Sequence, residues 1–225
     1  MDKKIARKIN KAIIETNHPV LDFRTTEAKT RTKWIKKYLK PYINKKCRAL
    51  DLGCGAGKQS FELECLGAEV TGIDCSRNAI DYAKKIKNNI GSNCLFFVGD
   101  FAKIPFQRST FDLVIFPNNI IECSYDEIEK LTIEIKRILR KNGFFILTME
   151  DGLNKMVRNK NFDNNFDFDK GVYNSYVKIP KKKEYAYPTY FWTVPFAKHI
   201  FQKQFKLIDS REIEEEKVLL VFKNK

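Results

Sequence analysis

The chain of 225 residues lacks any run of the roughly 18 to 20 consecutive apolar residues that a membrane-spanning helix needs. Basic residues are spread through its N-terminus, so it also lacks the apolar core of a secretory signal. Glycine and proline are not in excess, at 10 and 7 residues, and a hydrophobic fraction of 43% is near the globular average. We therefore expect residues 1–225 to form a single cytoplasmic domain with no membrane partner.

Metal-binding patterns are also missing. The cysteines form no C-x-x-C pair and have no neighbouring histidine, which argues against a zinc site, so we expect no metal. Reduced cysteines then serve as small apolar fillers, with a thiol trio for a soft substrate such as arsenite as the alternative. The six are Cys47, Cys54, Cys65, Cys75, Cys94 and Cys123. The only histidines, His18 and His199, are either general bases or, more commonly at such positions, surface or packing residues.

Acidic residues are outnumbered by basic ones, 28 to 42, which gives a formal net charge of +14. A basic surface attracts phosphate, so nucleic acid is a possible partner. Lysine outnumbers arginine about three to one, however, a bias that AT-rich coding produces without functional pressure. The one tight basic run, Lys181–Lys183, is either a solvated loop or a phosphate or RNA contact. The charge permits nucleic-acid binding without favouring it.

What the chain does have is a strand that runs into alternate glycines. Ala49–Leu52 is followed by Gly53, Gly55 and Gly57, and Asp74 ends the next strand about 20 positions later. Glycine adopts positive φ without steric cost and lets backbone N–H groups approach a ligand. A parallel β-α-β unit holds a ribose with such an acid, so the pattern predicts a nucleoside site.

Two residues distinguish this site from a dinucleotide site. Lys58 stands where G-x-G-x-x-G has its third glycine, and Asp51 lies at the strand end. The Asp51 carboxylate would repel a pyrophosphate but attract a ligand that carries a sulfonium and an α-ammonium. A cationic nucleoside is thus favoured over NAD, and an oxidoreductase with this topology is disfavoured.

At these residues the chain resembles the class I S-adenosylmethionine-dependent methyltransferases, in particular their small-molecule members. The family's first motif matches Asp51–Gly57, its ribose acid Asp74 and its adenine-contacting pair Asp100–Phe101. Its fourth strand matches Thr110–Phe116, and its helix end, glycine turn and fifth strand match Ile138–Leu147. The resemblance covers roughly residues 35–150 and, more loosely, the last strand pair.

The resemblance implies S-adenosyl-L-methionine as cofactor and S-adenosyl-L-homocysteine as product. Asp74 would accept from both ribose hydroxyls, Asp100 from the adenine amino group, and Phe101 would lie against the ring or donate its backbone N–H. The glycine loop would face the methionine part, with Asp51 behind it. The expected cofactor-binding residues are Asp51, Gly53, Cys54, Gly55, Gly57, Asp74, Cys75, Asp100, Phe101 and Asn118.

Strands and helices alternate along the centre of the chain, which predicts an α/β fold with a parallel, doubly wound sheet and helices on both faces. The resemblance makes it a Rossmann-like sheet of seven strands with an antiparallel last strand. The expected strands are Arg48–Leu52, Glu69–Ile73, Cys94–Val98, Phe111–Phe116, Phe144–Met149, Phe205–Ser210 and Val218–Phe222. The expected helices are Gly57–Leu66, Arg77–Asn89, Tyr125–Leu139 and Val194–Gln202, and Ser76 and Ser124 are natural N-caps.

Within the single domain, residues 43–150 are the expected cofactor core and 193–225 a helix and strand pair. Residues 1–42 are expected to form N-terminal helices, over 2–17 and Thr26–Leu39, that cover the site. There Arg24, Arg31 and Trp34 are either pocket residues or surface cations and a packing aromatic. Residues 151–192 break the alternation and are predicted to be a long loop that acts as a lid or substrate insertion. A surface hairpin held by its aromatics is the alternative.

The acceptor is less well specified by the sequence. The Asn/Asp-Pro-Pro-aromatic run of enzymes that methylate exocyclic amines is absent, because Pro117 precedes Asn118 and Asn119. No catalytic residue is assigned; Asn118, Asn119 and Tyr190 are pocket candidates, and Tyr187, Tyr190 and Trp192 either cage a cationic amine or belong to the core. We predict a monomeric or homodimeric methyltransferase acting on nitrogen or oxygen of a small molecule. The alternative is an RNA- or protein-modifying methyltransferase or binding module with the same fold.

Overall fold

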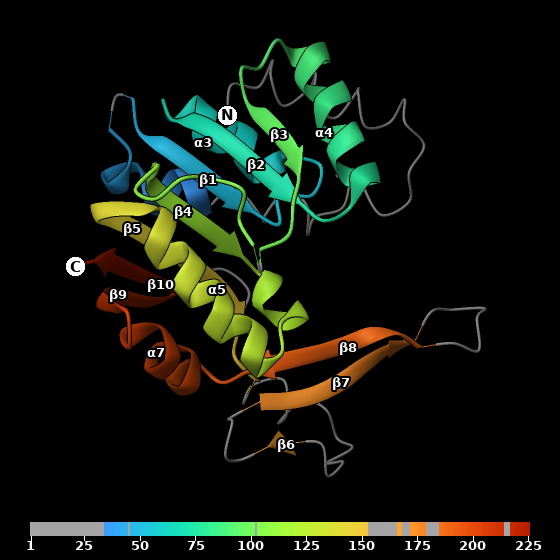
Figure 1. Cartoon of the computed structure of the whole chain (residues 1–225), viewed down its shortest axis with the longest axis vertical. Helices are drawn as coiled ribbons and strands as arrows, with labels where there is room; N and C mark the ends of the chain where they lie inside the picture. Colours follow the sequence, from blue (N-terminus) through green and yellow to red (C-terminus); the bar gives the residue numbers. More distant parts are fainter. Residues whose placement is uncertain are drawn as a thin grey trace.

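A seven-stranded sheet organises the chain, in the strand order β3-β2-β1-β4-β5-β10-β9 (Figure 1). The computed structural model describes residues 34–44, 46–101, 103–152, 166–167, 172–178, 185–213 and 217–225. The strands of this sheet are β1 (Arg48–Leu52), β2 (Glu69–Asp74), β3 (Leu95–Val98), β4 (Phe111–Pro117), β5 (Leu139–Glu150), β9 (Phe205–Ile213) and β10 (Lys217–Asn224). All seven lie where the sequence predicts a strand, and the Rossmann-like fold class is confirmed.

The direction of the strands also agrees with the prediction. The strand β1 pairs in parallel with β2 on one side and with β4 on the other. The pairs β2–β3 and β4–β5 are parallel too, whereas β10 is antiparallel to both of its neighbours, β5 and β9. The chain reverses its direction of travel across the sheet between β1 and β4, and ligands bind at the carboxyl ends of the strands at such a switch point.

Helices cover both faces of this sheet. They are the π-helix η2 (Ile35–Leu39), the 3₁₀ helices η3 (Lys40–Tyr42) and η4 (Asn119–Glu122), and the α-helices α3 (Lys58–Cys65), α4 (Arg77–Ile90), α5 (Tyr125–Ile138) and α7 (Val194–Gln202). Because side chains alternate along a strand, successive residues of β1 enter different cores. Leu50 joins the core under α5 and α7, and Ala49 joins the core under η2, α3 and α4. Figure 1 shows α5 and α7 together on one face.

The helix starts follow from their caps. The Ser76 Oγ accepts from the backbone N–H of Ala79 at 3.3 Å at the start of α4. At the start of α5, Ser124 and Glu127 form a reciprocal capping box, which satisfies two backbone N–H groups that a helix start leaves unpaired. Both predicted N-caps are therefore present.

The strand β5 begins earlier than expected. It starts at Leu139, directly after α5, and passes through Asn142 at φ 65° instead of starting after a glycine turn. The pairing with β4 shifts register between Phe111 and Leu113. Gly143 is required there, because a Cβ atom would lie 2.9 Å from the Asp112 carbonyl oxygen. The predicted turn is thus an irregularity within a longer strand.

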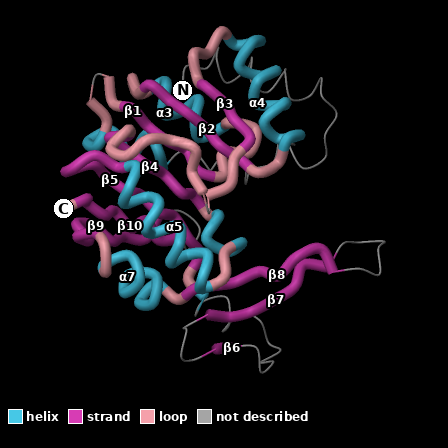
Figure 2. The backbone as a smooth tube through the Cα atoms, viewed as in Figure 1, coloured by secondary structure: helices cyan, strands magenta, loops and turns pink. Residues whose placement is uncertain are grey.

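The prediction of a long loop over residues 151–192 is wrong for the described part of that segment. A second, antiparallel sheet contains β6 (Phe166–Asp167), β7 (Val172–Lys178) and β8 (Tyr185–Trp192). Tyrosine, valine, phenylalanine and tryptophan favour strands, and this propensity outweighs the polar residues between them. The hairpin of β7 and β8 extends away from the main sheet (Figure 2), so the alternative of a hairpin describes the segment better. A role as a lid stays a prediction.

The hairpin joins the main body at the end of β8. Trp192 is fully buried, and its indole N–H donates to the Cys123 carbonyl oxygen at 3.1 Å. Gly152 permits a close approach of the two chain segments, because a Cβ atom there would lie 2.2 Å from the Phe191 carbonyl oxygen. Trp192 is therefore a core residue and not part of an aromatic cage.

Several predictions concern residues that the structure does not describe. These are the helix over 2–17, most of the helix Thr26–Leu39, and the residues His18, Arg24, Arg31 and Lys181–Lys183. Trp34 is described and is only 5% exposed, packed in the core with α3, so it is a packing aromatic. Among the described residues, no helix is both long and apolar enough to span a bilayer.

Candidate cofactor-binding site

The glycine loop lies at the carboxyl end of β1, beside the end of β2. Gly53, Gly55 and Gly57 all have positive φ, at 67°, 52° and 82°. The N–H groups of Gly53 and Cys54 both donate to the Ile73 carbonyl oxygen, at 2.8 and 3.0 Å, which ties the loop to β2. A Cβ at Gly55 would meet no atom of the described residues within 4 Å. The loop is thus fixed at its start and open at Gly55.

Asp74, at the end of β2, holds the loop from the other side. One oxygen, Oδ2, accepts from the Gly55 N–H at 2.9 Å, and the other, Oδ1, accepts from the Ser76 N–H at 2.9 Å. Each carboxylate oxygen has more than one acceptor position, so both keep capacity for a ligand hydroxyl. Asp74 is therefore oriented by backbone groups, with an acceptor pair of the kind that a ribose diol requires.

Asp51 is the buried carboxyl group of the site. It is fully buried, and its Oδ2 accepts from the Ser60 hydroxyl of α3 at 2.6 Å. Its Oδ1 has no hydrogen-bond partner among the described residues. Burial raises the pKa of Asp51 to about 7; the Ser60 hydrogen bond opposes this effect and the charge of Asp74 adds to it. A buried acceptor without a donor is costly, and a ligand N–H would remove that cost.

These residues fit the group that the sequence implies. S-adenosyl-L-methionine carries a ribose diol for Asp74 and an ammonium whose N–H groups would serve the Asp51 side of the loop. The open space at Gly55 leaves room beside the backbone for the methionine part. Sequence reasoning missed Ser60, because a serine in the first turns of a helix carries no signal of its own.

The cysteines behave mostly as apolar side chains. Cys47, Cys54, Cys94 and Cys123 are buried, whereas Cys65 and Cys75 are exposed. Burial raises the pKa of Cys47 to about 11 and that of Cys94 to about 12, and it raises the pKa of Cys54 well above its ordinary value, with Asp51 adding to the effect. Protonated thiols at these positions are poor nucleophiles and metal ligands. Within the described residues no cluster of three or more metal-ligating side chains occurs.

Asp100 and Phe101 follow β3 at the same edge of the sheet. Asp100 is exposed, and its carbonyl oxygen accepts from the Lys103 N–H at 3.2 Å. The ring of Phe101 packs edge-on against that of Phe116 of β4, with centroids 5.9 Å apart. The structure thus brings this pair to the edge where Asp51 and Asp74 lie.

The two asparagines after β4 face different partners. Asn118, at φ 61°, donates its backbone N–H to the Thr148 carbonyl oxygen at 2.8 Å, and its Oδ1 accepts from the Thr148 hydroxyl at 3.3 Å. The Asn119 Nδ2 instead donates to the carbonyl oxygens of Leu52 and Gly53, at 2.9 and 3.1 Å. Asn119 therefore contacts the glycine loop directly, while Asn118 binds the neighbouring strand.

The remaining candidate residues lie on β8 and α7. Tyr190 is partly buried and packs against the core under α5 and α7. The side chain of Tyr187 lies outside the described part of the chain, and Trp192, the third member of the proposed cage, is buried in the core. His199 is exposed on α7. The structure does not bring Tyr190, Trp192 and His199 together as a catalytic group.

The fold and this edge together define a class I S-adenosylmethionine-dependent methyltransferase: a seven-stranded sheet with an antiparallel β10, a glycine loop after β1 and an acid at the end of β2. Residues 43–205 match the sequence profile of a family described as a methyltransferase domain. The chain belongs to this methyltransferase family.

Individual relatives share parts of the chain. It is similar to the sterol 4-C-methyltransferase strm-1 of Caenorhabditis elegans, with 30% identity over 108 residues, 47% of this chain and 31% of that protein. It is also similar to the cypemycin N-terminal methyltransferase of a Streptomyces species, with 35% identity over 104 residues, 45% of this chain and 41% of that protein. The matched part thus spans less than half the length of these curated relatives.

Solved structures cover more of the chain. The PH0226 protein of Pyrococcus horikoshii OT3 superimposes with a TM-score of 0.77 at 27% identity, covering 91% of this chain and 94% of that one. Other solved structures of similar fold are described as S-adenosylmethionine-dependent methyltransferases, at identities that show the fold alone.

Proposed function

We propose that this chain transfers a methyl group from S-adenosyl-L-methionine to a nitrogen or oxygen atom of a small molecule. The observation that carries the cofactor half of the proposal is the unsatisfied Oδ1 of the fully buried Asp51 beside an open, positive-φ Gly55. An acidic, buried acceptor next to accessible backbone suits an ammonium-bearing nucleoside and disfavours a pyrophosphate.

The chain's own residues bind and orient. Asp74 would receive the two ribose hydroxyls, Asp51 an N–H of the methionine part, and Asp100 the adenine amino group, with Phe101 and the backbone of Cys75 next to the base and ribose. Gly53, Cys54, Gly55 and Gly57 would surround the methionine part. Asn119, which donates to the loop carbonyl oxygens of Leu52 and Gly53, would keep the loop at a fixed distance from the acceptor side.

When bound, S-adenosyl-L-methionine supplies a sulfonium whose methyl carbon is attacked in line, and S-adenosyl-L-homocysteine leaves as the thioether. Little acid–base assistance is required when the nucleophile is a neutral amine, so alignment and exclusion of water are the main tasks of the protein.

The acceptor is proposed from three candidate residues and from a motif that the sequence lacks. Asn118, Asn119 and Tyr190 lie after β4 and on β8, and the sequence lacks the run that is typical of enzymes acting on exocyclic base amines. The relatives are named for position 4-C of a sterol and for the N-terminus of cypemycin, so acceptors differ among similar chains. The missing run is the reason that we favour a small amine or hydroxyl compound over a nucleic acid.

The experiment is a calorimetric titration of the purified protein with S-adenosyl-L-homocysteine and, separately, with NADH. We expect micromolar binding of the first and none of the second. Binding of NADH alone, or of neither ligand, would contradict the cofactor assignment. Transfer of labelled methyl groups to a panel of small amines, hydroxyl compounds and RNA then tests the acceptor, and salt-sensitive transfer to RNA alone would contradict the small-molecule proposal.

A further inference from the structure

The connection between β3 and β4 differs from most other connections of the sheet. Residues 99–101 and 103–110, its described part, contain no helix, although helices join most other strands of the sheet. Its backbone groups therefore require partners outside regular secondary structure. The connection begins with Asp100 and Phe101 and then runs along α5 to the start of β4. Hydrogen bonds that fix its later part therefore also restrict the positions of Asp100 and Phe101.

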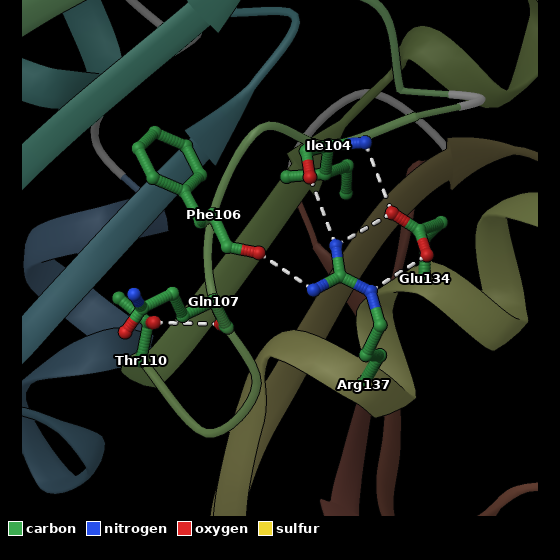
Figure 3. Close-up of polar contacts among 6 residues, drawn as sticks. All are labelled: Ile104, Phe106, Gln107, Thr110, Glu134 and Arg137. Atoms are coloured by element: carbon green, nitrogen blue, oxygen red, sulfur yellow. Dashed lines mark hydrogen bonds and ion pairs between the residues drawn. The ribbon is translucent and has the colours of Figure 1, made fainter.

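Arg137, in the last turn of α5, supplies three of these partners, two of them through its side chain (Figure 3). Its guanidinium donates to the carbonyl oxygens of Phe106 through Nη1, at 2.6 Å, and of Ile104 through Nη2, at 2.8 Å. Its backbone carbonyl accepts from the Ser109 N–H at 2.9 Å. One residue thus binds the connection at three positions, with the planar donor fork that only arginine provides.

Glu134, one turn earlier, completes the arrangement. Its carboxylate accepts from Arg137 Nε and Nη2, at 2.8 and 2.7 Å, and from the Ile104 N–H at 3.0 Å. The two side chains are 18% and 27% exposed, so solvent screens the pair only in part. The Arg137 hydrogen bond lowers the pKa of Glu134, and Glu134 in turn raises the pKa of Arg137, which keeps both groups charged.

The contacts continue from this pair towards the ligand edge. Ile104 is 2% exposed and belongs to the core under α5, so its position is fixed on both its polar and its apolar sides. Only three residues separate it from Asp100, and within them the Lys103 N–H donates to the Asp100 carbonyl oxygen and the Phe101 ring packs on Phe116. A displacement of Ile104 would therefore shift Asp100.

We infer that Arg137 and Glu134 are positioning residues for the nucleobase end of the cofactor: they act through the β3–β4 connection to place Asp100 and Phe101. This rests on the proposed function in one respect, namely that Asp100 and Phe101 receive the adenine. The pair touches neither cofactor nor substrate, so it contributes to the discrimination of the base and not to the methyl-transfer step.

The test compares Arg137→Lys with Arg211→Lys. Lysine keeps the charge at 137 but cannot donate to Ile104, Phe106 and Glu134 together. Arg211 is a matched control, because it is exposed on β9, at the opposite edge of the sheet, and forms an ion pair with Asp209 of the same strand. Should Arg137→Lys fail to fold, Glu134→Gln, which keeps one acceptor oxygen, takes its place with a smaller expected effect.

Two readouts are measured. Amide hydrogen exchange of the ligand-free protein should become about tenfold faster in peptides spanning 103–108 in Arg137→Lys, because charge-assisted hydrogen bonds are lost, and should stay unchanged there in Arg211→Lys. The ratio of affinities for S-adenosyl-L-homocysteine and S-inosyl-L-homocysteine, which lacks the base amino group, should fall about fivefold in Arg137→Lys alone. A general loss of stability would weaken both ligands equally and leave the ratio unchanged.

The outcomes separate the two hypotheses. Unchanged exchange in Arg137→Lys overturns the inference, and so does faster exchange with an unchanged affinity ratio while the wild-type protein discriminates between the ligands. If the wild-type protein binds neither ligand, the proposed function fails, and cofactor positioning fails with it. If it binds both equally, Asp100 does not receive the amino group and the inference is again overturned.

Discussion

The proposed cofactor edge and the proposed acceptor side of this protein are assembled over different distances along the chain. At the cofactor edge, Asp51 binds Ser60 and Gly55 binds Asp74, contacts between residues 9 and 19 positions apart. On the acceptor side, Asn119 binds Leu52 across 67 positions and Trp192 binds Cys123 across 69. The part of the first region that contains Asp51 and Asp74 is thus built from one β-α-β unit, and the second region forms only when remote segments meet.

This difference predicts that damage at the cofactor edge removes ligand binding, whereas damage on the acceptor side changes stability or alignment first. The largest expected effect is that of Asp74→Ala. It removes the acceptors for the N–H groups of Gly55 and Ser76 together with the proposed ribose contact. We expect affinity for S-adenosyl-L-homocysteine to fall at least 100-fold, roughly 3 kcal/mol, by calorimetry. The exposed Asp81 of α4 offers a control, and Asp81→Ala should bind as the wild type does.

A second prediction concerns pH. Burial raises the pKa of Asp51 from 3.8 to about 7, so between these pH values the folded protein binds more protons than the unfolded chain. The contribution of Asp51 to the free energy of unfolding is therefore fully present below pH 4 and is lost as pH rises through 7, by about 4 kcal/mol. Chemical denaturation of the ligand-free protein at pH 5 and pH 8 should show about 3 kcal/mol of this loss, because part of it has already occurred at pH 5. Asp51→Asn should remove this difference in the free energy of unfolding, whereas Asp81→Asn should keep it. The same difference between pH 5 and pH 8 in all three proteins would count against an ionisable Asp51.

A third prediction tests the link between the two regions. Asn119→Ala removes two hydrogen bonds to the glycine loop, from a side chain that lies against Gly53. Affinity for S-adenosyl-L-homocysteine should fall about tenfold, equivalent to roughly 1.4 kcal/mol. Asn118→Gly, which loses the contact with the Thr148 hydroxyl and still suits the left-handed backbone at φ 61°, should change it less. The reverse order of the two variants would place the more important asparagine at 118.

The smallest expected effect is on the acceptor side. Trp192→Phe keeps an aromatic ring in the core but removes the N–H that donates to the Cys123 carbonyl oxygen. The free energy of unfolding should fall by about 1 to 3 kcal/mol, because a buried acceptor loses its partner. Affinity for S-adenosyl-L-homocysteine should stay within twofold of the wild type. A tenfold loss of affinity would instead connect the hairpin to the cofactor edge.

The same contrast explains what could be predicted from the sequence. The strands β1 and β2, the helix α3 and the glycine loop follow from local patterns, since alternation, glycine spacing and caps act within a few residues. The structure agrees with each of them to within about a residue. The hairpin of β7 and β8 was only the alternative to a long loop, because polar residues lie among and between its strand-favouring aromatics.

Side-chain partners were harder to predict than elements. Asn118 and Asn119 are adjacent and chemically identical, and the left-handed backbone at Asn118 decides which amide turns towards the glycine loop. Trp192 was equally plausible in a cage or in the core until its partner, the carbonyl of Cys123, was known. Arg137 and Glu134 read as an ordinary i, i+3 pair on a helix, and only the return of the β3–β4 connection beside them gives them further partners.

The position of β10 also constrains biosynthesis. Although it follows every other strand in sequence, β10 lies inside the sheet, between β5 and β9, and the Asn224 amide donates to the carbonyl oxygens of Leu139 and Arg140. During translation, the edge of β5 that pairs with β10 therefore stays unpaired until residue 224 has left the ribosome. Nascent chains that stall before this point would present that edge to chaperones, so the yield of native protein should depend on how quickly the last strand is synthesised.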